Sequence, residues 1–276
     1  MELARSIAHL RPLLPRDRSI GLVPTMGALH DGHLSLVRLA RERDDVLVMS
    51  IFVNPTQFGP TEDFASYPRD EKRDLELAEE AGVDVVFLPE VEEMYPQGAT
   101  THISVGTLST VLEGADRPGH FDGVCTIVGK LFNIVAPTHA YFGQKDAQQV
   151  AVIKKMVMDL DFPIEIVVAP TVRERNGLAL SSRNEYLTAD ERVRATAIYR
   201  ALEAGRDALK AHGTEAAEKV MWELLVAHDV QPSYAHVIDP NTLAPAGEHG
   251  PALLVIAARV GKTRLIDNLL IGQEER

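Results

Sequence analysis

Two histidines three residues apart, His30 and His33, carry the strongest chemical signal near the start of the chain. They close the segment Pro24-Thr25-Met26-Gly27-Ala28-Leu29-His30-Asp31-Gly32-His33, which follows a short apolar run and leads into a helical pattern. A helix N-terminus offers backbone N–H groups and a partial positive charge, and two imidazoles would add donors aimed at the same anion. The segment therefore predicts a phosphate-binding loop at the carboxyl end of a strand, where open α/β sheets bind ligands.

The histidine pair has two simpler explanations, a pair that only caps or packs and a pair of metal ligands. A metal-dependent hydrolase needs at least one more ligand at suitable spacing, and neither that ligand nor the His-Glu-x-x-His zinc pattern is evident. Gly27 permits a tight turn, and Gly32 leaves room for a flat nucleotide against the backbone. The order of strand, loop and helix therefore favours a nucleotide.

Two later segments carry further groups that suit phosphates. Gly143-Gln144-Lys145-Asp146 follows an expected strand and opens a helix, although Lys145 and Asp146 taken alone would more often form a surface ion pair. Leu180-Ser181-Ser182-Arg183 offers two hydroxyls and a guanidinium, although these residues would also make a plain polar linker. A mobile loop of this kind could close over a substrate.

Amide side chains suggest a second kind of recognition. Asn54-Pro55-Thr56-Gln57-Phe58 follows the second expected strand, and Gln148-Gln149 lies one turn into the helix after Lys145. Gln57 and Gln149 could hold a hydroxy acid by its carboxylate and hydroxyl without adding charge, although a single glutamine is more often a surface residue.

Two other features are interpreted as structural. Gly261-Lys262-Thr263 resembles the end of a P-loop, but Ile256 occupies the place of the required glycine and a strand pattern surrounds the segment. Cys125 lies in an apolar helical pattern, which is typical of a core residue rather than a nucleophile.

The elements that must position these residues alternate between short β-branched runs and longer helical stretches. This pattern predicts an α/β fold for residues 1–171, a Rossmann-like, doubly wound parallel sheet that carries the catalytic site. Strands are expected at 20–24, 46–53, 83–88, 139–143 and 163–169, and helices at 32–43, 70–82, 122–136 and 145–160.

The pattern of expected helices and strands changes after residue 171. Residues 172–276 are expected to form a smaller α+β domain that acts as a lid, with a surface loop at 240–251. Its expected helices are 189–211 and 214–229, followed by strands at 233–238, 253–260 and 263–271.

Composition excludes several classes of protein. Of the 276 residues, 25% are charged and 45% are hydrophobic, as in ordinary globular domains, and the apolar run VLVMSIFV is far shorter than the roughly 20 residues needed to cross a bilayer. The net charge of −12 opposes binding to nucleic acid or anionic lipid. The N-terminal segment lacks the pattern of a secretory signal, so a cytoplasmic location is expected.

Six motifs occur in a fixed order along the chain: PTMGALHDGH, SIFVNPTQF, YPRD, YFGQKDAQQ, PTVRE and LSSRNEYL. With them the chain resembles the pantothenate synthetase family, the pantoate and β-alanine ligases, over nearly its whole length. The set is more specific than the HxGH pattern shared by all HIGH-type nucleotidyltransferases. The resemblance implies that pantoate attacks the α-phosphorus of ATP to give pantoyl adenylate and pyrophosphate, and that β-alanine then displaces AMP. It also implies Mg²⁺ with the ATP and a cytoplasmic homodimer.

The resemblance further implies roles for single residues. His33 takes the place of the catalytic proton donor, with His30 beside it on the phosphates and Lys145 as a third catalytic group. Gln57 corresponds to a residue that touches both pantoate and β-alanine, and Gln149 to a pantoate ligand. The implied ATP-binding residues are Met26, Gly27, Ala28, Leu29, His30, Asp31, Gly32, His33, Gly143, Gln144, Lys145, Asp146, Val172, Leu180, Ser181, Ser182 and Arg183.

Three positions depart from the family pattern. Leu180 stands where the family commonly has Met, and Gln144 where it has Glu, and both contacts are expected to run through the backbone. The acidic pair that often follows Tyr-Pro-Arg is here Arg73-Asp74, which leaves Asp74 as the expected neighbour of magnesium and the metal ligands otherwise unknown.

Two alternatives share part of this motif set. A nucleotidyltransferase of the same superfamily that acts on another small acid or nucleotide would not need the QKDAQQ and SSRN segments together. A sensor that binds ATP without turnover would be favoured if Gln57 and Gln149 were absent, and both are present.

Overall fold

The computed structural model describes residues 1–60, 62 and 64–272, and the contacts among them divide the chain into two units. The first unit comprises Met1–Gly143 and Val152–Pro170. The second comprises Gln144–Ala151 and the chain from Thr171 onward.

A six-stranded parallel sheet forms the first unit, in the order β1-β4-β3-β2-β5-β6. Strand β2 pairs with β3 on one side and with β5 on the other, so the chain reverses its progress across the sheet at β2. Such a reversal is the point at which open α/β sheets bind ligands. The strands are β1 Glu2–Ala4, β2 Ile20–Thr25, β3 Val46–Ile51, β4 Val85–Phe87, β5 His139–Gly143 and β6 Glu165–Ala169.

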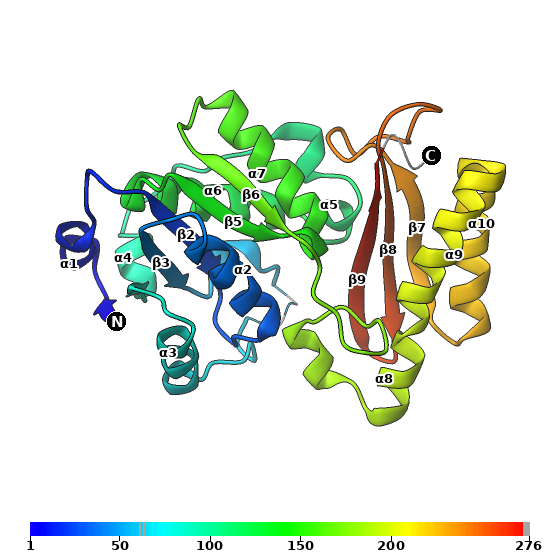
Figure 1. Cartoon of the computed structure of the whole chain (residues 1–276), viewed down its shortest axis with the longest axis horizontal. Coiled ribbons are helices and arrows are strands. Elements are labelled where there is room, and N and C mark those ends of the chain that lie inside the picture. Colours follow the sequence, from blue (N-terminus) through cyan, green and yellow to red (C-terminus); the bar gives the residue numbers. More distant parts are fainter. Residues whose placement is uncertain (61, 63, 273–276) are drawn as a thin grey trace. The chain divides into compact units, whose positions relative to one another are not determined.

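Helices cover both faces of this sheet, with α2 and α3 on one side and α6 and α7 on the other (Figure 1). Leu36 and Val37 of α2 pack against Val23 and Met49 of the strands in one buried cluster. Strand β3 is buried at every position, as expected of a parallel strand covered on both faces. The helices of this part of the chain are α1 Ile7–Leu10, α2 Asp31–Arg41, α3 Glu71–Glu80, α4 Val91–Met94, α5 Glu113–Asp116, α6 His120–Val135 and α7 Ala147–Asp159.

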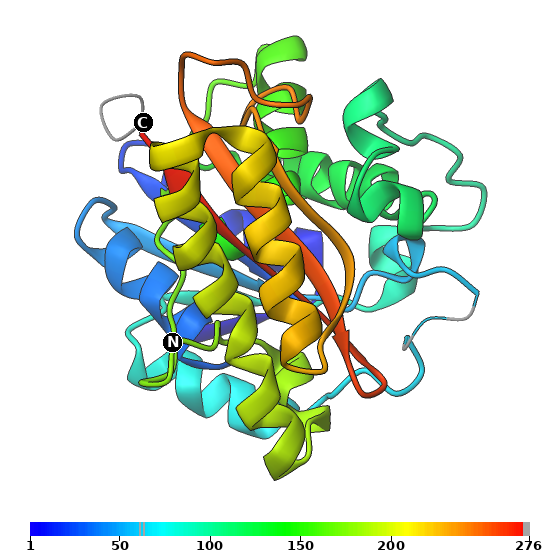
Figure 2. The same cartoon turned by 90° about the vertical axis from the view of Figure 1, so that its right-hand side faces the viewer.

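The second unit holds a three-stranded antiparallel sheet in the order β7-β8-β9. Helices α9 and α10 lie across one face of this sheet (Figure 2). Leu202 and Met221 of these helices share a buried core with Leu254 and Leu265 of the strands. The elements are α8 Ala189–Ala195, α9 Ala197–His212, α10 Thr214–Ala227, β7 Gln231–Ile238, β8 Ala252–Val260 and β9 Thr263–Ile271.

The predicted α/β class with a smaller α+β part is confirmed, and most predicted elements end within two residues of the observed ends. One prediction is wrong: the expected helix 189–211 is two helices, α8 and α9. The break falls at Thr196, whose hydroxyl donates to the carbonyl of Val193 at 2.7 Å and so competes with the helical hydrogen bonds. Strand β1 was not predicted, because three residues are too few to show a period.

The segment Gly261-Lys262 forms the turn between β8 and β9, with Val260 paired to Thr263. Gly261 has a φ of +59°, which only glycine adopts readily. The prediction that this segment is not a P-loop is therefore confirmed. None of the described helices is both long and apolar enough to span a membrane.

Candidate active site

The loop after β2 is held by hydrogen bonds to its backbone N–H groups. Gly27 N donates to the hydroxyl of Thr25 at 3.2 Å, while Ala28 N and Leu29 N donate to the two carboxylate oxygens of Asp74 at 2.9 and 2.8 Å. Gly27 has a φ of +80°, and a Cβ there would lie 2.7 Å from an Asp74 oxygen. A glycine is therefore required where the loop passes Asp74.

Asp74 is a buried carboxylate in the first turn of α3, with 2% of its surface exposed. Burial raises the pKa of Asp74, and the N–H groups of Leu29 and Ala28 oppose that rise. Because both oxygens already accept from the loop, Asp74 acts here as the support of the loop. Among the residues that the structure describes, no group of three or more His, Cys, Asp or Glu side chains could hold a metal ion.

The two histidines lie together at the start of α2, with ring centroids 4.1 Å apart and planes inclined by 31°. His30 is the N-cap of α2, and its Nδ1 accepts a hydrogen bond from Gly32 N at 3.1 Å. An acceptor nitrogen carries no proton, so the neutral ring holds its proton on Nε2. His30 can therefore donate from Nε2 while Nδ1 caps the helix.

The backbone of this loop departs from the expectation that it offers free N–H groups. The amides of Gly27, Ala28, Leu29 and Gly32 are all bonded within the protein. The side chains of the histidines, rather than these four amides, are the groups through which the loop can meet a phosphate.

The Gln57 side chain has a defined orientation after β3. Asn54 Nδ2 donates both to the carbonyl of Gly123 and to Gln57 Oε1, each at 3.1 Å. Gln57 Oε1 therefore faces Asn54, and Gln57 Nε2 donates to the sulfur of Met26 at 2.9 Å. A thioether is a weak acceptor, so this NH₂ group can turn to a stronger one.

A polar network that the sequence did not suggest holds the backbone of Gln57. His120 Nδ1 donates to the carbonyl of Gln57 at 2.8 Å, and His120 Nε2 accepts from Arg117 at 2.9 Å. Arg117 forms two further bonds to the carboxylate of Glu62, at 2.9 and 2.5 Å. The only signal in the sequence is a pair of polar residues, Arg117 and His120, where an apolar helix begins.

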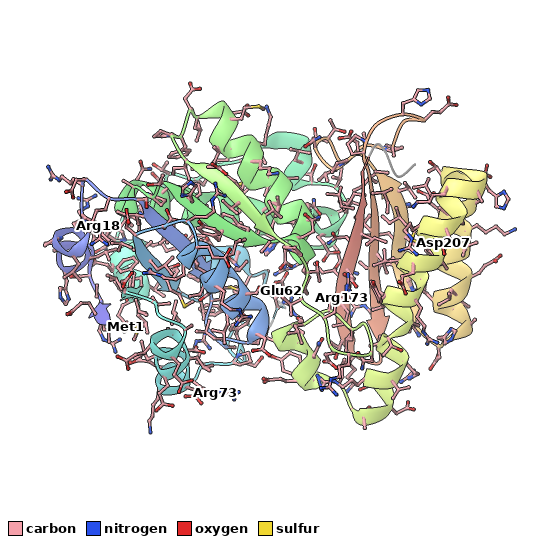
Figure 3. The ribbon with its side chains drawn as sticks, in the orientation of Figure 1. Met1, Arg18, Glu62, Arg73, Arg173 and Asp207 are labelled. Atoms are coloured by element: carbon pink, nitrogen blue, oxygen red, sulfur yellow. The ribbon has the colours of Figure 1, made fainter. Side chains whose placement is uncertain are left out.

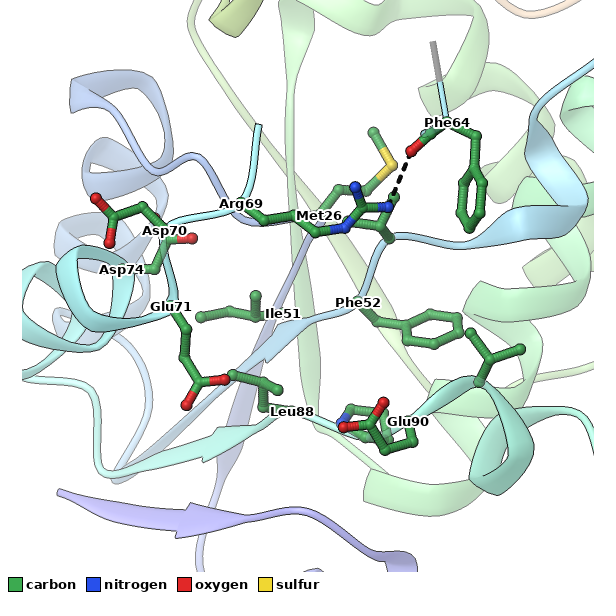
Figure 4. A pocket seen from close by; sticks show the side chains of 13 residues that line it. Met26, Ile51, Phe52, Phe64, Arg69, Asp70, Glu71, Asp74, Leu88 and Glu90 are labelled. Atoms are coloured by element: carbon green, nitrogen blue, oxygen red, sulfur yellow. Dashed lines mark hydrogen bonds between the residues drawn. The ribbon is translucent and has the colours of Figure 1, made fainter. Parts of the chain in front are cut away.

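A cavity of about 210 Å³ opens at the carboxyl ends of β2, β3 and β4 (Figure 4). Met26 and Asp74 line it, so it borders the loop that carries the histidines. Arg69 reaches across it and donates to the carbonyl of Phe64 at 2.9 Å (Figure 4). The remaining lining residues include Ile51, Phe52, Val53, Asp70, Glu71, Leu88, Pro89, Glu90 and Val91.

In the second unit, the turn before α7 contains Gln144, Lys145 and Asp146. Lys145 Nζ lies 3.4 Å from an oxygen of Asp146, and a fifth of the Lys145 side chain is exposed. Asn268 of β9 bonds to the backbone of this turn, a contact that sequence reasoning missed. Gln149 lies on the first turn of α7 and is half-buried.

The segments around Val172 and Leu180 run side by side, because Leu180 N donates to the carbonyl of Val172 at 3.0 Å. Arg173, labelled in Figure 3, lies against β9 and donates to Asp267. A short 3-10 helix, Ser182–Tyr186, follows Leu180. Ser181 caps its N-terminus, and the Ser181 hydroxyl accepts from Arg183 N at 3.2 Å.

The expected site residues thus fall into two sets, one in each unit. The first unit holds Met26–His33, Gln57 and Gly143, with Met26 bonded to Gln57, and the second holds Gln144–Asp146, Gln149, Val172 and Leu180–Arg183, with Val172 bonded to Leu180. Sequence reasoning missed the residues that support both sets, Asp74 in its observed role and Asn268. The clue at Asn268 is an Asp-Asn pair inside the otherwise apolar strand LIDNLLI.

Comparison with known proteins gives a consistent result. Residues 2–270 match the family model of pantoate-beta-alanine ligase. A pantothenate synthetase from Moorella thermoacetica is 56% identical, with 98% of this chain and 99% of the relative covered. One from Herpetosiphon aurantiacus is 51% identical, with 98% and 100% covered.

Solved structures that are similar to this chain come from the same family. The crystal structure of pantothenate synthetase from Thermus thermophilus has a TM-score of 0.93 at 49% identity, covering 98% of this chain and 99% of that one. The pantoate-beta-alanine ligase from Francisella tularensis, complexed with beta-gamma ATP and beta-alanine, has a TM-score of 0.81 at 36% identity, covering 98% and 97%. The chain belongs to the pantoate-beta-alanine ligase family and is a ligase that forms an amide bond.

Proposed function

We propose that this ligase joins pantoate to β-alanine in an ATP-dependent reaction of two steps. In the first, a carboxylate oxygen of pantoate attacks the α-phosphorus of ATP, and the bond from that phosphorus to the bridging oxygen breaks to release pyrophosphate. In the second, the amine of β-alanine attacks the acyl carbon of pantoyl adenylate and loses a proton, and AMP leaves with its oxygen. The observation that carries the proposal is the pair His30 and His33, which follows a loop that Asp74 supports at the carboxyl end of β2.

The adenylation step needs donors placed where negative charge grows, on the α-phosphate and on the departing pyrophosphate. His30 suits this role because its Nδ1 is occupied by Gly32 N and its proton lies on Nε2. We assign His33 as the proton donor and Lys145 as the third cationic or donating group. The further ATP contacts are those that the family resemblance implies, at Met26–His33, Gly143–Asp146, Val172 and Leu180–Arg183.

Gln57 and Gln149 form the proposed amide clamp for pantoate. The orientation of Gln57 supports this role, because among the described residues its NH₂ group donates to a thioether, and a carboxylate would accept more strongly. An uncharged clamp leaves the carboxylate nucleophilic, whereas a lysine would stabilise the charge that the carboxylate must give up. Holding pantoate in line with phosphorus can supply an effective molarity on the order of 10⁵ M, so no protein nucleophile is needed.

Three further properties are proposed from the family resemblance alone: Mg²⁺ bound with ATP, a homodimer and a cytoplasmic location. The described residues contain no set of carboxylates or histidines grouped to hold a metal ion. We therefore assign no protein ligand to Mg²⁺. Light scattering of the purified protein tests the dimer directly.

The decisive test is release of AMP and pyrophosphate from magnesium ATP by the purified protein, with pantoate and β-alanine added singly and together. AMP formation that requires both acids supports the ligase reaction by way of an adenylate. A nucleotide product that forms with another acid, or no turnover with either substrate, contradicts the proposal.

Replacement of Gln57 tests the clamp. Gln57→Ala should weaken pantoate binding while ATP binding stays intact, and Gln57→Glu should weaken it further because two carboxylates then repel each other. Calorimetric titration with each ligand separately provides the measurement, and ATP affinity is the internal control. An unchanged pantoate affinity in both variants would refute the clamp.

A further inference from the structure

Strand β9 carries two buried polar residues, Asp267 and Asn268, within an otherwise apolar run. Each is only 4% exposed. Successive side chains of a strand point to opposite faces of the sheet. Leu265 and Ile271 share the alternation of Asp267 and belong to the core beneath α9 and α10. Asp267 therefore faces the helices, and Asn268 points to the other face.

The amide of Asn268 is fully used on one short turn. Its Nδ2 donates to the carbonyls of Gln144 and Lys145 at 2.9 and 2.8 Å, and its Oδ1 accepts from Gln144 Nε2 at 3.0 Å. The Gln144 carbonyl belongs to the peptide before the Lys145 Cα, and the Lys145 carbonyl to the peptide after it. Fixing both peptides fixes the direction in which the Lys145 side chain leaves the backbone.

Asp267 holds a second segment on the opposite face. Its carboxylate accepts two bonds from Arg173, at 2.5 and 2.9 Å, and the guanidinium lies 4.1 Å from the ring centre of Tyr199. Arg173 is bridged to Ala179 across a narrow hairpin, and Arg173 also donates to the carbonyl of Gly177 at 3.2 Å. Removing one partner of such a pair would leave an uncompensated buried charge, so Arg173 and Asp267 hold the hairpin against β9.

The two segments are the ones that lead to candidate phosphate contacts. The first contains Lys145 itself, and the second continues from Ala179 into Leu180–Arg183. Neither Asp267 nor Asn268 belongs to the expected site, yet adjacent positions on one strand reach both segments. The alternation of side chains in a strand makes this double contact possible.

We propose that Asp267 and Asn268 are positioning residues of the ligase. Asn268 orients Lys145 through the peptides on either side of it, and Asp267 orients the hairpin before Leu180–Arg183 through Arg173. This inference rests on the proposed role of Lys145 in adenylation.

The test is a double-mutant cycle with Asn268→Ala and Lys145→Ala, measured as the single-turnover rate of pantoyl adenylate formation. Asn268→Ala should lower the rate about 10- to 100-fold, the size of effect that a small misplacement of a catalytic group can have. In the Lys145→Ala background the same change should lower it less than about threefold, because coupled residues are not additive. Leu270→Ala, at an exposed position of the same strand, is the matched control and should leave the rate unchanged.

Asp267→Asn gives the contrasting result, since it acts on the other segment. It should lower the rate in both backgrounds by a similar factor. Asn268→Asp keeps the shape of the side chain but turns a carboxylate toward two carbonyls, so it should be at least as severe as Asn268→Ala. If Asn268→Ala fails to fold, Asn268→Ser retains one donor and should give an intermediate rate, with circular dichroism checking the fold.

The outcomes separate this inference from the proposed function. A normal rate in Lys145→Ala refutes the proposed role of Lys145. A slow Lys145→Ala with a normal Asn268→Ala, or with additive effects of the two changes, overturns the positioning role of Asn268. A normal rate in Asp267→Asn overturns the role of Asp267.

Discussion

The loop that carries His30 and the turn that carries Lys145 are supported by opposite chemistry. The first exposes N–H groups toward a neighbouring helix, and the carboxylate of Asp74 accepts from two of them. The second exposes carbonyls toward a neighbouring strand, and the amide of Asn268 donates to two of them. The kind of backbone group that needs a partner thus matches the side chain that supplies it. N–H groups need an acceptor, which a carboxylate provides, and carbonyls need a donor, which an amide provides without a charge.

The two supports also differ in their response to pH. Asp74 is a buried acid whose pKa is raised by burial, so its charge changes with pH. Asn268 does not titrate. The support of the His30 loop by Asp74 therefore depends on pH, whereas the support of the Lys145 turn by Asn268 does not.

The largest effects should come from His33 and Lys145, the groups proposed to be catalytic. His33→Ala and Lys145→Ala should each lower pantoyl adenylate formation roughly 10²–10³-fold, as expected for one lost donor to the transition state. Rapid-quench single-turnover assays measure this. Near-normal adenylation in either variant would refute the proposed role of the residue that was replaced.

Asp74→Asn should produce the next largest effect. The replacement keeps the shape but turns an NH₂ group toward either Ala28 N or Leu29 N, which leaves a buried N–H without an acceptor. We expect the free energy of unfolding to fall by about 1–3 kcal/mol, with slower adenylation. Urea unfolding gives the stability.

The matched control is Asp70→Asn. Asp70 caps the same helix α3 by accepting from Arg73 N, and asparagine caps about as well as aspartate. An equal loss in the free energy of unfolding from the two variants would show that Asp74 stabilises the protein no more than the helix cap at Asp70 does.

A pair of glycine replacements tests how closely each region is packed. Gly27→Ala should lower the free energy of unfolding by about 1–3 kcal/mol, because φ is +80° and a Cβ would lie 2.7 Å from Asp74. Gly143→Ala should change it by less than about 0.5 kcal/mol, because no atom lies within 4 Å of its Cβ position. Thermal unfolding of both variants measures the two changes. A similar loss of stability in Gly27→Ala and Gly143→Ala would contradict the expected difference between the two positions.

The smallest effect should be the pH dependence of the Asp74 support. Because burial raises the pKa of Asp74 above its ordinary value of 3.8, the folded protein binds more protons than the unfolded chain just above that pH. Stability relative to Asp74→Asn should therefore fall as pH rises through this window and then level off. Unfolding measured from about pH 4 to pH 7 would show it, and a gap that widens with pH would contradict the direction.

Much of this protein was predictable from its sequence. Strands such as 139–143 and 263–271 were placed at their observed ends, because hydrophobic periodicity is a property of consecutive residues. The motifs around His30, Gln57, Lys145 and Ser181 likewise indicated the family, and the comparisons confirm it.

The supports of the site were decided by the tertiary structure alone. The sequence offered Asp74 as an expected neighbour of magnesium and Asn268 as one residue of a predicted strand, and it indicated a supporting role for neither. Asp74 reaches backbone groups 45 and 46 residues away, and Asn268 reaches groups 123 and 124 residues away. A local pattern carries no information about such partners, because they meet only after strand order, register and helix packing are set. The sequence by itself therefore indicated the family and the residues that the proposal assigns to the chemistry, and the fold decided what holds them in place.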